Sequence, residues 1–166
     1  MQRNILYGAA ATRRGIKDYG EGSRGVFAGG SNVIDYITIN TTGNATDFGD
    51  LTVARSGLGG VSDGSRGCFG GGNGPSNVID YITINTTGNA TDFGDLTTAG
   101  NTVASLSGKG RGVWAGPETG VYTNIIEYIT ISTTGNSTDF GNLSGVRSFI
   151  AGLSNGTRGV FGGGLT

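Results

Sequence analysis

The pattern of hydrophobic and polar positions predicts short β-strands that are buried on both sides. In residues 33–39, with the sequence VIDYITI, positions 33, 35, 37 and 39 fall on one face of an extended strand and positions 34, 36 and 38 on the other. Both faces are mainly apolar, whereas an exposed antiparallel strand has a polar outer face. A strand that lies between two neighbouring sheets fits this pattern. The Thr-Gly-Asn stretch at residues 42–44 follows and supplies residues suited to a tight turn.

The same pattern returns along the chain as an internal repeat. Residues 31–52 and 76–97 are identical over all 22 positions, and residues 124–143 form a third, diverged copy. The equivalent tyrosines Tyr36, Tyr81 and Tyr128 lie 45 and 47 residues apart. A second motif, Arg-Gly-hydrophobic-aromatic, precedes each copy and occurs once more near the end of the sequence. Its arginines are Arg24, Arg66, Arg111 and Arg158.

Each repeat therefore predicts four strands, which we expect at residues 57–61, 25–28, 33–39 and 46–51 and their equivalents. The repeats divide a single domain into units of about residues 13–54, 55–99 and 100–146 and a half unit of residues 147–166. A unit buries its apolar faces only against its neighbours, so isolated units are not expected to fold. The half unit leaves two alternatives: a small closed ring of four sheets in one chain, or several chains joined edge to edge.

The composition supports an all-β fold and excludes several other classes. Glycine makes up 35 of 166 residues, but collagen also needs a strict Gly-X-Y period and much proline, and only two prolines are present. The formal net charge of −1 gives no electrostatic footprint for nucleic acid. The apolar runs are too short for membrane insertion, and the N-terminus lacks a signal-peptide h-region. The missing signal peptide leads us to expect a cytoplasmic location.

The absence of histidine removes the commonest general base and the commonest metal ligand. We therefore expect no enzyme, no cofactor and no metal. The alternative is a small hydrolase or lyase that uses a loop carboxylate as its base. The single cysteine, Cys68, takes a position that valine fills in the other units, which predicts a buried small hydrophobic residue.

The order of the motifs resembles the kelch repeat. In the second unit, Arg55-Ser-Gly-Leu is followed by Arg66-Gly-Cys-Phe-Gly-Gly-Gly, then by Asn77-Val-Ile-Asp-Tyr and Thr91-Asp-Phe. Kelch proteins have an arginine-led strand, a glycine doublet after the second strand, a spaced tyrosine and a later tryptophan. The resemblance covers about residues 11–166 and implies that each unit is one four-stranded blade of a β-propeller. Phenylalanine takes the tryptophan position, and Gly100 replaces the leading arginine of the third unit.

The sequence segment Gly-Asn-Ala-Thr-Asp-Phe-Gly-Asp-Leu is also similar to repeats in predicted structural and tail proteins of environmental bacteriophages. This resemblance implies a non-catalytic module of a phage particle or tail. Such a module would self-assemble as a homo-oligomer and bind a glycan or protein surface. A further alternative is an engineered or truncated propeller fragment.

The recurring arginines allow two interpretations. A ring of them could line a central channel and hold an anion. Alternatively, each guanidinium is structural and satisfies carbonyls or carboxylates between units. We favour the structural role because recurrence in every unit is what a scaffold requires. Asp35, Asp80 and Glu127 recur at matching positions and are candidate partners.

A second recurring set consists of Asn44, Asp47 and Asp50 and their equivalents. Hard oxygen ligands of this kind suit calcium. Asn and Asp side chains also bond nearby backbone N–H groups in turns. We favour turn chemistry because the third copy replaces one carboxylate with Asn142.

The connections that vary most between units, residues 70–76 and 115–123, are the candidate ligand-binding loops, because loops on a rigid scaffold commonly carry binding. The first contributes Asn73 and Pro75. The second contributes Glu118 and Tyr122, next to Trp114. An aromatic ring beside a carboxylate suits stacking on a sugar or anchoring a protein partner. Ordinary drift after duplication is the alternative.

Overall fold

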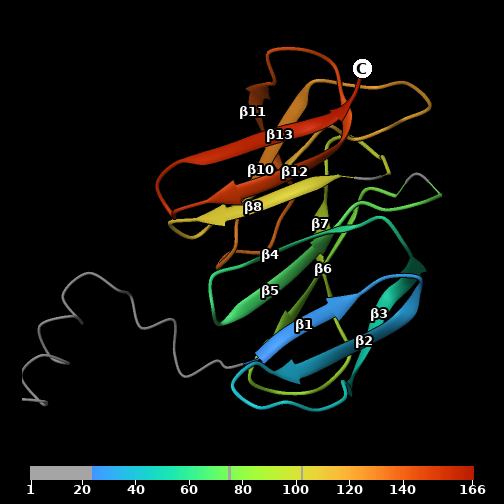
Figure 1. Cartoon of the computed structure of the whole chain (residues 1–166). Coiled ribbons are helices and arrows are strands. Elements are labelled where there is room, and N and C mark those ends of the chain that lie inside the picture. The colour runs from blue at the N-terminus through green and yellow to red at the C-terminus, as the bar shows by residue number, and fades with distance from the viewer. Residues whose placement is uncertain (1–23, 75, 102) are drawn as a thin grey trace, which may run out of the picture.

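The computed structural model describes residues 24–74, 76–101 and 103–166, and the regular structure in these ranges is entirely β-strand (Figure 1). These ranges contain no helix that is long and apolar enough to cross a membrane. The strands are β1 (Arg24–Ala28), β2 (Ser31–Thr38), β3 (Thr46–Arg55), β4 (Gly59–Ser62), β5 (Arg66–Gly70), β6 (Val78–Thr83), β7 (Thr91–Asp95), β8 (Ala104–Gly108), β9 (Arg111–Ala115), β10 (Ile125–Thr130), β11 (Thr138–Asn142), β12 (Ser148–Ser154) and β13 (Gly159–Leu165).

The strands form four separate antiparallel sheets, each of which follows the chain from strand to strand. The orders are β1-β2-β3, β4-β5-β6-β7, β8-β9-β10-β11 and β12-β13. Figure 1 shows the sheets arranged one after another, from β1–β3 at one end to β12–β13 at the other. The predicted all-β class is confirmed. The described sheets do not close into a ring.

The sheets follow the sequence repeat. The second and third units each form four antiparallel strands in chain order, and the half unit forms two. The first unit shows three strands in the described residues, and the strand expected near Arg13 lies outside them. The fourth strand of the first unit is longer than predicted. It was expected to end at residue 51, but β3 continues to Arg55, which pairs with Ser31 at the start of β2.

A bulge recurs at the same place in the first three sheets, and in the first two it turns a phenylalanine into the core. In the first sheet Ile34 pairs with Gly49 and Asp35 with Asp47, so Phe48 is the extra residue. The register shifts in the same way after Ile79 and after Ile126. A bulge bends the strand and re-aims a side chain. Gly49 allows it because its φ is +143°, a value that residues with a side chain rarely adopt.

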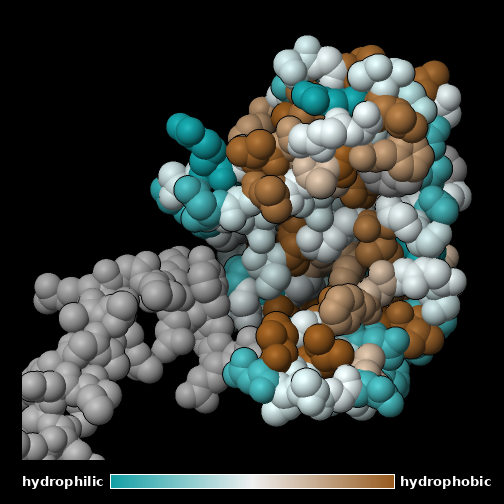
Figure 2. Space-filling model, in the orientation of Figure 1, coloured by the Kyte–Doolittle hydropathy of each residue, from teal (hydrophilic) through white to brown (hydrophobic). Residues whose placement is uncertain are grey.

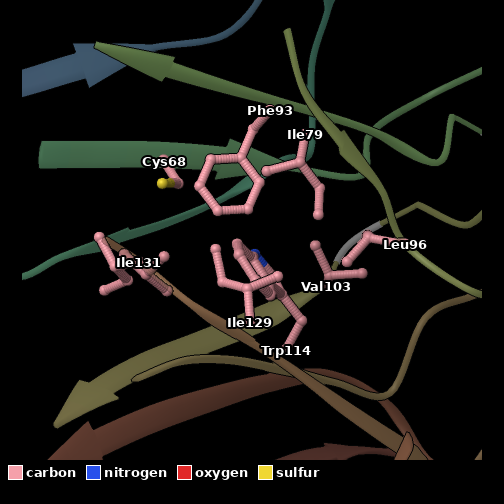
Figure 3. Close-up of a cluster of buried hydrophobic side chains, with 9 residues drawn as sticks. Cys68, Ile79, Phe93, Leu96, Val103, Trp114, Ile129 and Ile131 are labelled. Atoms are coloured by element: carbon pink, nitrogen blue, oxygen red, sulfur yellow. The ribbon is translucent and has the colours of Figure 1, made fainter. Parts of the chain in front are cut away.

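Most of the hydrophobic core lies between consecutive sheets. Figure 3 shows the largest cluster, in which Trp114 and Ile129 of the third sheet point toward Phe93 and Ile79 of the second. A second cluster joins the first two sheets, and a third joins the third sheet to β12–β13. The stack is therefore held by the same kind of contact at each step, as expected for a repeat whose units bury apolar area against their neighbours.

The middle strand β6 demonstrates burial on both faces. Its Ile79 packs in the cluster shared with the third sheet, whereas Ile82, and Ile84 just beyond the strand, pack in the cluster shared with the first sheet. The alternating apolar pattern of residues 78–84 is explained by this position between two neighbours. We call the side of a sheet that faces the preceding sheet its leading face, and the opposite side its trailing face.

Candidate functional site

The tryptophan of the candidate binding loop belongs to the core. Trp114 is fully buried, and its indole N–H donates to the carbonyl oxygen of Gly59 at 2.9 Å. It lies in β9, with its ring against the preceding sheet. The ring is therefore not available for stacking on a ligand, which does not fit the role suggested by its position in the sequence.

The other candidate loop residues are tied into local turns. Glu118 accepts a hydrogen bond from the backbone N–H of Gly120 at 2.9 Å, and its backbone pairs with Asn101. Asn73 donates its side-chain amide to the hydroxyl of Ser56 at 2.8 Å. Tyr122 is half-buried. Pro75 lies outside the described residues. Among the described residues no hydrogen bond joins the Asn73 loop to the side chain of Glu118, so these contacts give no shared ligand site.

The recurring arginines lie between sheets. Arg24 donates to the carbonyl oxygen of Ile84 at 2.9 Å, and Arg66 donates to that of Ile131 at 3.0 Å. Each therefore bonds the following sheet. Each guanidinium also covers the tyrosine of its own sheet, with Arg24 at 4.6 Å from the ring centre of Tyr36. This is the geometry expected of a structural arginine.

Two of the four arginines have only part of this environment. Arg111 covers the ring of Tyr128 at 4.4 Å, but the described residues supply no carbonyl partner for its guanidinium. Arg158 is exposed, directly before β13. Both lack the same neighbour, because the half unit contains no third and fourth strands among the described residues.

Two of the recurring carboxylates, Asp80 and Glu127, are buried and bonded to neighbouring segments, but the partner of Asp80 differs from the expected arginine series. Asp80 and Arg55 form a buried ion pair at 2.9 Å, and Thr52 donates to the other carboxylate oxygen. The guanidinium of Arg55 also donates to the carbonyl oxygen of Phe69 at 3.1 Å. The sequence predicts that Asp80 pairs with an arginine of the series that contains Arg66, which lies eleven residues after Arg55. Arg55 is the residue that reaches Asp80.

The third unit replaces this ion pair with hydrogen bonds. Gly100 stands where the second unit has Arg55, and Glu127 stands where it has Asp80. The buried carboxylate of Glu127 accepts from the backbone and hydroxyl of Thr97 at 2.6 and 2.7 Å and from the hydroxyl of Ser137 at 2.7 Å. The longer side chain of Glu127 reaches the hydroxyls of Thr97 and Ser137. These donors replace the guanidinium of the second unit, because a buried carboxylate requires compensating donors.

The Asn and Asp residues of the turns connect neighbouring sheets. The side-chain oxygen of Asn89 accepts the N–H of Asp50 at 3.1 Å, and Asn136 does the same for Asp95 at 3.0 Å. The backbone of the same turn adds bonds, with Gly88 donating to Phe48 and Ala90 donating to Asp50, both at 2.7 Å. We call this set of contacts the turn latch. Within the described ranges no cluster of three or more acidic or sulfur ligands suits a metal ion.

Cys68 is buried in the cluster between the second and third sheets. Burial raises the pKa of its thiol to about 12, although Arg66 nearby acts in the opposite direction. The thiolate is the reactive form. We predict that a thiol reagent at pH 8 does not label the native protein and labels it fully in denaturant. Rapid labelling of the native chain would show that the thiol is accessible.

Two surfaces are open although the equivalent surfaces are buried at the internal steps: the leading face of the first sheet, and the part of the third sheet's trailing face that the half unit leaves uncovered; we call them the open ends. Phe48 and Phe93 are 2% and 3% exposed under the following sheet, whereas the equivalent Phe140 is 53% exposed. On the leading face, Ile84 and Ile131 are 8% and 0% exposed, whereas the equivalent Ile39 is 62% exposed. The sequence alone missed this contrast, because the three repeats have the same residue types at these positions. These open ends are the candidate binding surfaces.

One hollow lies at the open end near Phe140, and another lies between the first and second sheets. The first, of about 390 Å³, lies between the third sheet and the half unit and is lined by residues that include Arg111, Val113, Ile126, Phe140 and Phe161. The other, of about 310 Å³, lies on the first two sheets, and its lining includes Val26, Gly67 and Ile84. Figure 2 shows hydrophobic patches near both ends of the stack.

No protein-family model matches the chain, and no curated protein matches it.

Proposed function

We propose that the chain is a non-catalytic structural module, built from kelch-like propeller repeats, that assembles with copies of itself through the open ends of its stack. The observation that carries this proposal is the exposure of Phe140 and Ile39, whose equivalents are buried at each internal step. The burial of exposed apolar side chains away from water is favourable and stabilises an interface. Equivalent surfaces pack against each other between consecutive sheets of the chain, so the two exposed surfaces are suited to bind those of a second copy.

The internal use of the candidate chemistry supports a structural role. Arg55, Asp80 and Glu127 are engaged in contacts that hold sheets together. The turn residues Asn89 and Asn136 bond the preceding sheet. The similarity of the repeat wording to phage structural and tail proteins supports placing such an assembly in a virus particle. Glycan or protein binding by its outer loops would be a property of the assembled form.

The test is the native mass in solution, measured by light scattering over a range of protein concentrations. We expect a multimer of the 16.7 kDa chain. Ile39→Asp should shift it to the monomer, because a charge replaces an apolar side chain in the interface. Val121→Asp is the matched control, since Val121 is also an exposed apolar residue but lies in an outer loop. A wild-type chain that stays monomeric at every concentration would contradict self-assembly.

A further inference from the structure

We infer that β12–β13 of one copy and β2–β3 of a second copy form one four-stranded sheet, and that this exchange is reciprocal in a closed pair of chains. The inference rests on the proposed self-assembly and specifies its geometry. The half unit supplies the first two strands of a repeat, and the first sheet contains the last two. Joined in the order β12-β13-β2-β3, they reproduce the order of β4-β5-β6-β7.

The exchange is possible because β13 can replace β1. β1 begins with the sequence Arg-Gly-Val-Phe at residues 24–27, and the same four residues recur at 158–161, where Arg158 directly precedes β13. In the first sheet Arg24 pairs with Thr38 and Val26 pairs with Tyr36. With β13 in that place, Arg158 would pair with Thr38 and Val160 with Tyr36. The strand lost and the strand gained make nearly equal contacts, which makes exchange of an element between protomers a low-cost route to a dimer.

The gain comes from filling the hollow at Phe140. In the second sheet Ile82 and Ile84 pack onto the trailing face of the first sheet. The identical β2 sequence places Ile37 and Ile39 at those positions. Carried beside β13, they would enter the hollow of about 390 Å³ that Ile126 and Phe140 line.

The polar contacts of the internal interfaces have matching partners at this new interface. The guanidinium of Arg111, which lines the hollow, would donate to the carbonyl oxygen of Ile39, as Arg24 does to Ile84. The turn at Gly43 and Asn44 would form the turn latch with Phe140 and Asn142. All four of these turn and strand residues are exposed in the single chain. The new interface thus repeats, residue for residue, contacts that the chain makes twice internally.

The second hollow, at Gly67, would be filled by β12 of the same shared sheet. Val61 of β4 faces Gly112 in the next sheet, and Leu106 of β8 faces Gly159, where an added Cβ would lie 2.7 Å from the leucine side chain. The next member of this series is Leu153 of β12, which is exposed. The equivalent glycine is Gly67, which lines the hollow of about 310 Å³. In the shared sheet, Leu153 would pack on the Gly67 of the second copy.

The closed pair would contain six four-stranded sheets, since each chain contributes two complete sheets and half of two shared ones. This number lies within the range of roughly 4–8 found in propellers. It also gives β13 a partner along its free edge, which removes an exposed edge strand.

The test is a disulfide between positions 38 and 158 in a Cys68→Val background. Antiparallel partners lie about 4.5–5.5 Å apart at Cα, within the roughly 4.4–6.8 Å range of disulfides. We expect Thr38→Cys with Arg158→Cys to give, after oxidation and denaturation, mainly a covalent species of twice the chain mass. Thr38→Cys with Val121→Cys is the control and should give none, because Val121 is exposed in an outer loop that is not part of the proposed shared sheet.

The outcomes separate this inference from the proposed function. A native multimer that forms no link between positions 38 and 158 would overturn the shared sheet and leave self-assembly standing. A ladder of higher covalent multimers would overturn the closed pair. A chain that stays monomeric and forms no link would overturn both. Arg24→Cys with Thr38→Cys reports whether β1 keeps its place, and efficient closure within one chain would contradict the exchange.

Discussion

Asp80→Ala should lower the free energy of unfolding by about 3–5 kcal/mol, because it leaves the buried guanidinium of Arg55 without its counter-charge. Both side chains of the pair are almost completely buried. The same change also removes the acceptor for Thr52, which joins the first sheet to the second. For a chain of this length the loss corresponds to a fall in Tm of roughly 6–20 °C. Denaturant unfolding at a fixed protein concentration measures it.

A matched control and a compensating pair make this result specific. Asp92→Ala removes an exposed carboxylate from the same sheet and should change stability by less than about 0.5 kcal/mol. Arg55→Met combined with Asp80→Leu removes both charges, and we expect it to be more stable than Asp80→Ala alone. If Asp80→Ala left the unfolding curve unchanged, the pair would be solvated rather than buried.

Trp114→Ala should destabilise the protein by about 3–5 kcal/mol through the cavity that it leaves between the second and third sheets. The indole is fully buried, and Gly59 and Gly70 are kept small by it, since an added Cβ at either would lie 2.9 Å from the ring. The substitution also leaves the carbonyl of Gly59 without its donor. A combined loss of packing and hydrogen bonding at the centre of the stack should unfold the second and third sheets together.

Phe27→Ala is the control for this prediction because Phe27 has the same position in the Arg-Gly-hydrophobic-aromatic motif. It lies on the open leading face and is exposed. We expect its removal to change stability by less than about 1 kcal/mol at low protein concentration. Equal losses for the two variants would contradict the assignment of Trp114 to the core and of Phe27 to an open end. Circular dichroism during thermal unfolding gives both values.

The candidate binding residues are spread apart in the structure. The aromatic and carboxylate residues that suggest a ligand site in sequence belong to different layers of the fold. Trp114 faces the preceding sheet, whereas Glu118 caps a turn at the edge. The two residues are close in the sequence, but the side chain of Trp114 points from β9 into the core, whereas Glu118 lies in the loop that follows this strand.

The sequence by itself determined the all-β class, the strand order within a unit and the burial of the middle strand on two faces. These follow from local information: an alternation with period two, turn residues at fixed positions, and a 22-residue segment that recurs unchanged. The burial of Cys68 was also predictable, because valine fills the equivalent positions and a thiol can replace it without a new polar partner.

Only the tertiary structure decided which groups meet between sheets. The pairing of Asp80 with Arg55 depends on how one strand leads into the next, and the turn latch depends on the distance between neighbouring sheets. Identical sequences also differ in exposure, as Ile39 and Ile84 show, because burial is set by the presence of a neighbour. Local patterns give each residue its face, and the packing of whole sheets decides whether that face is covered.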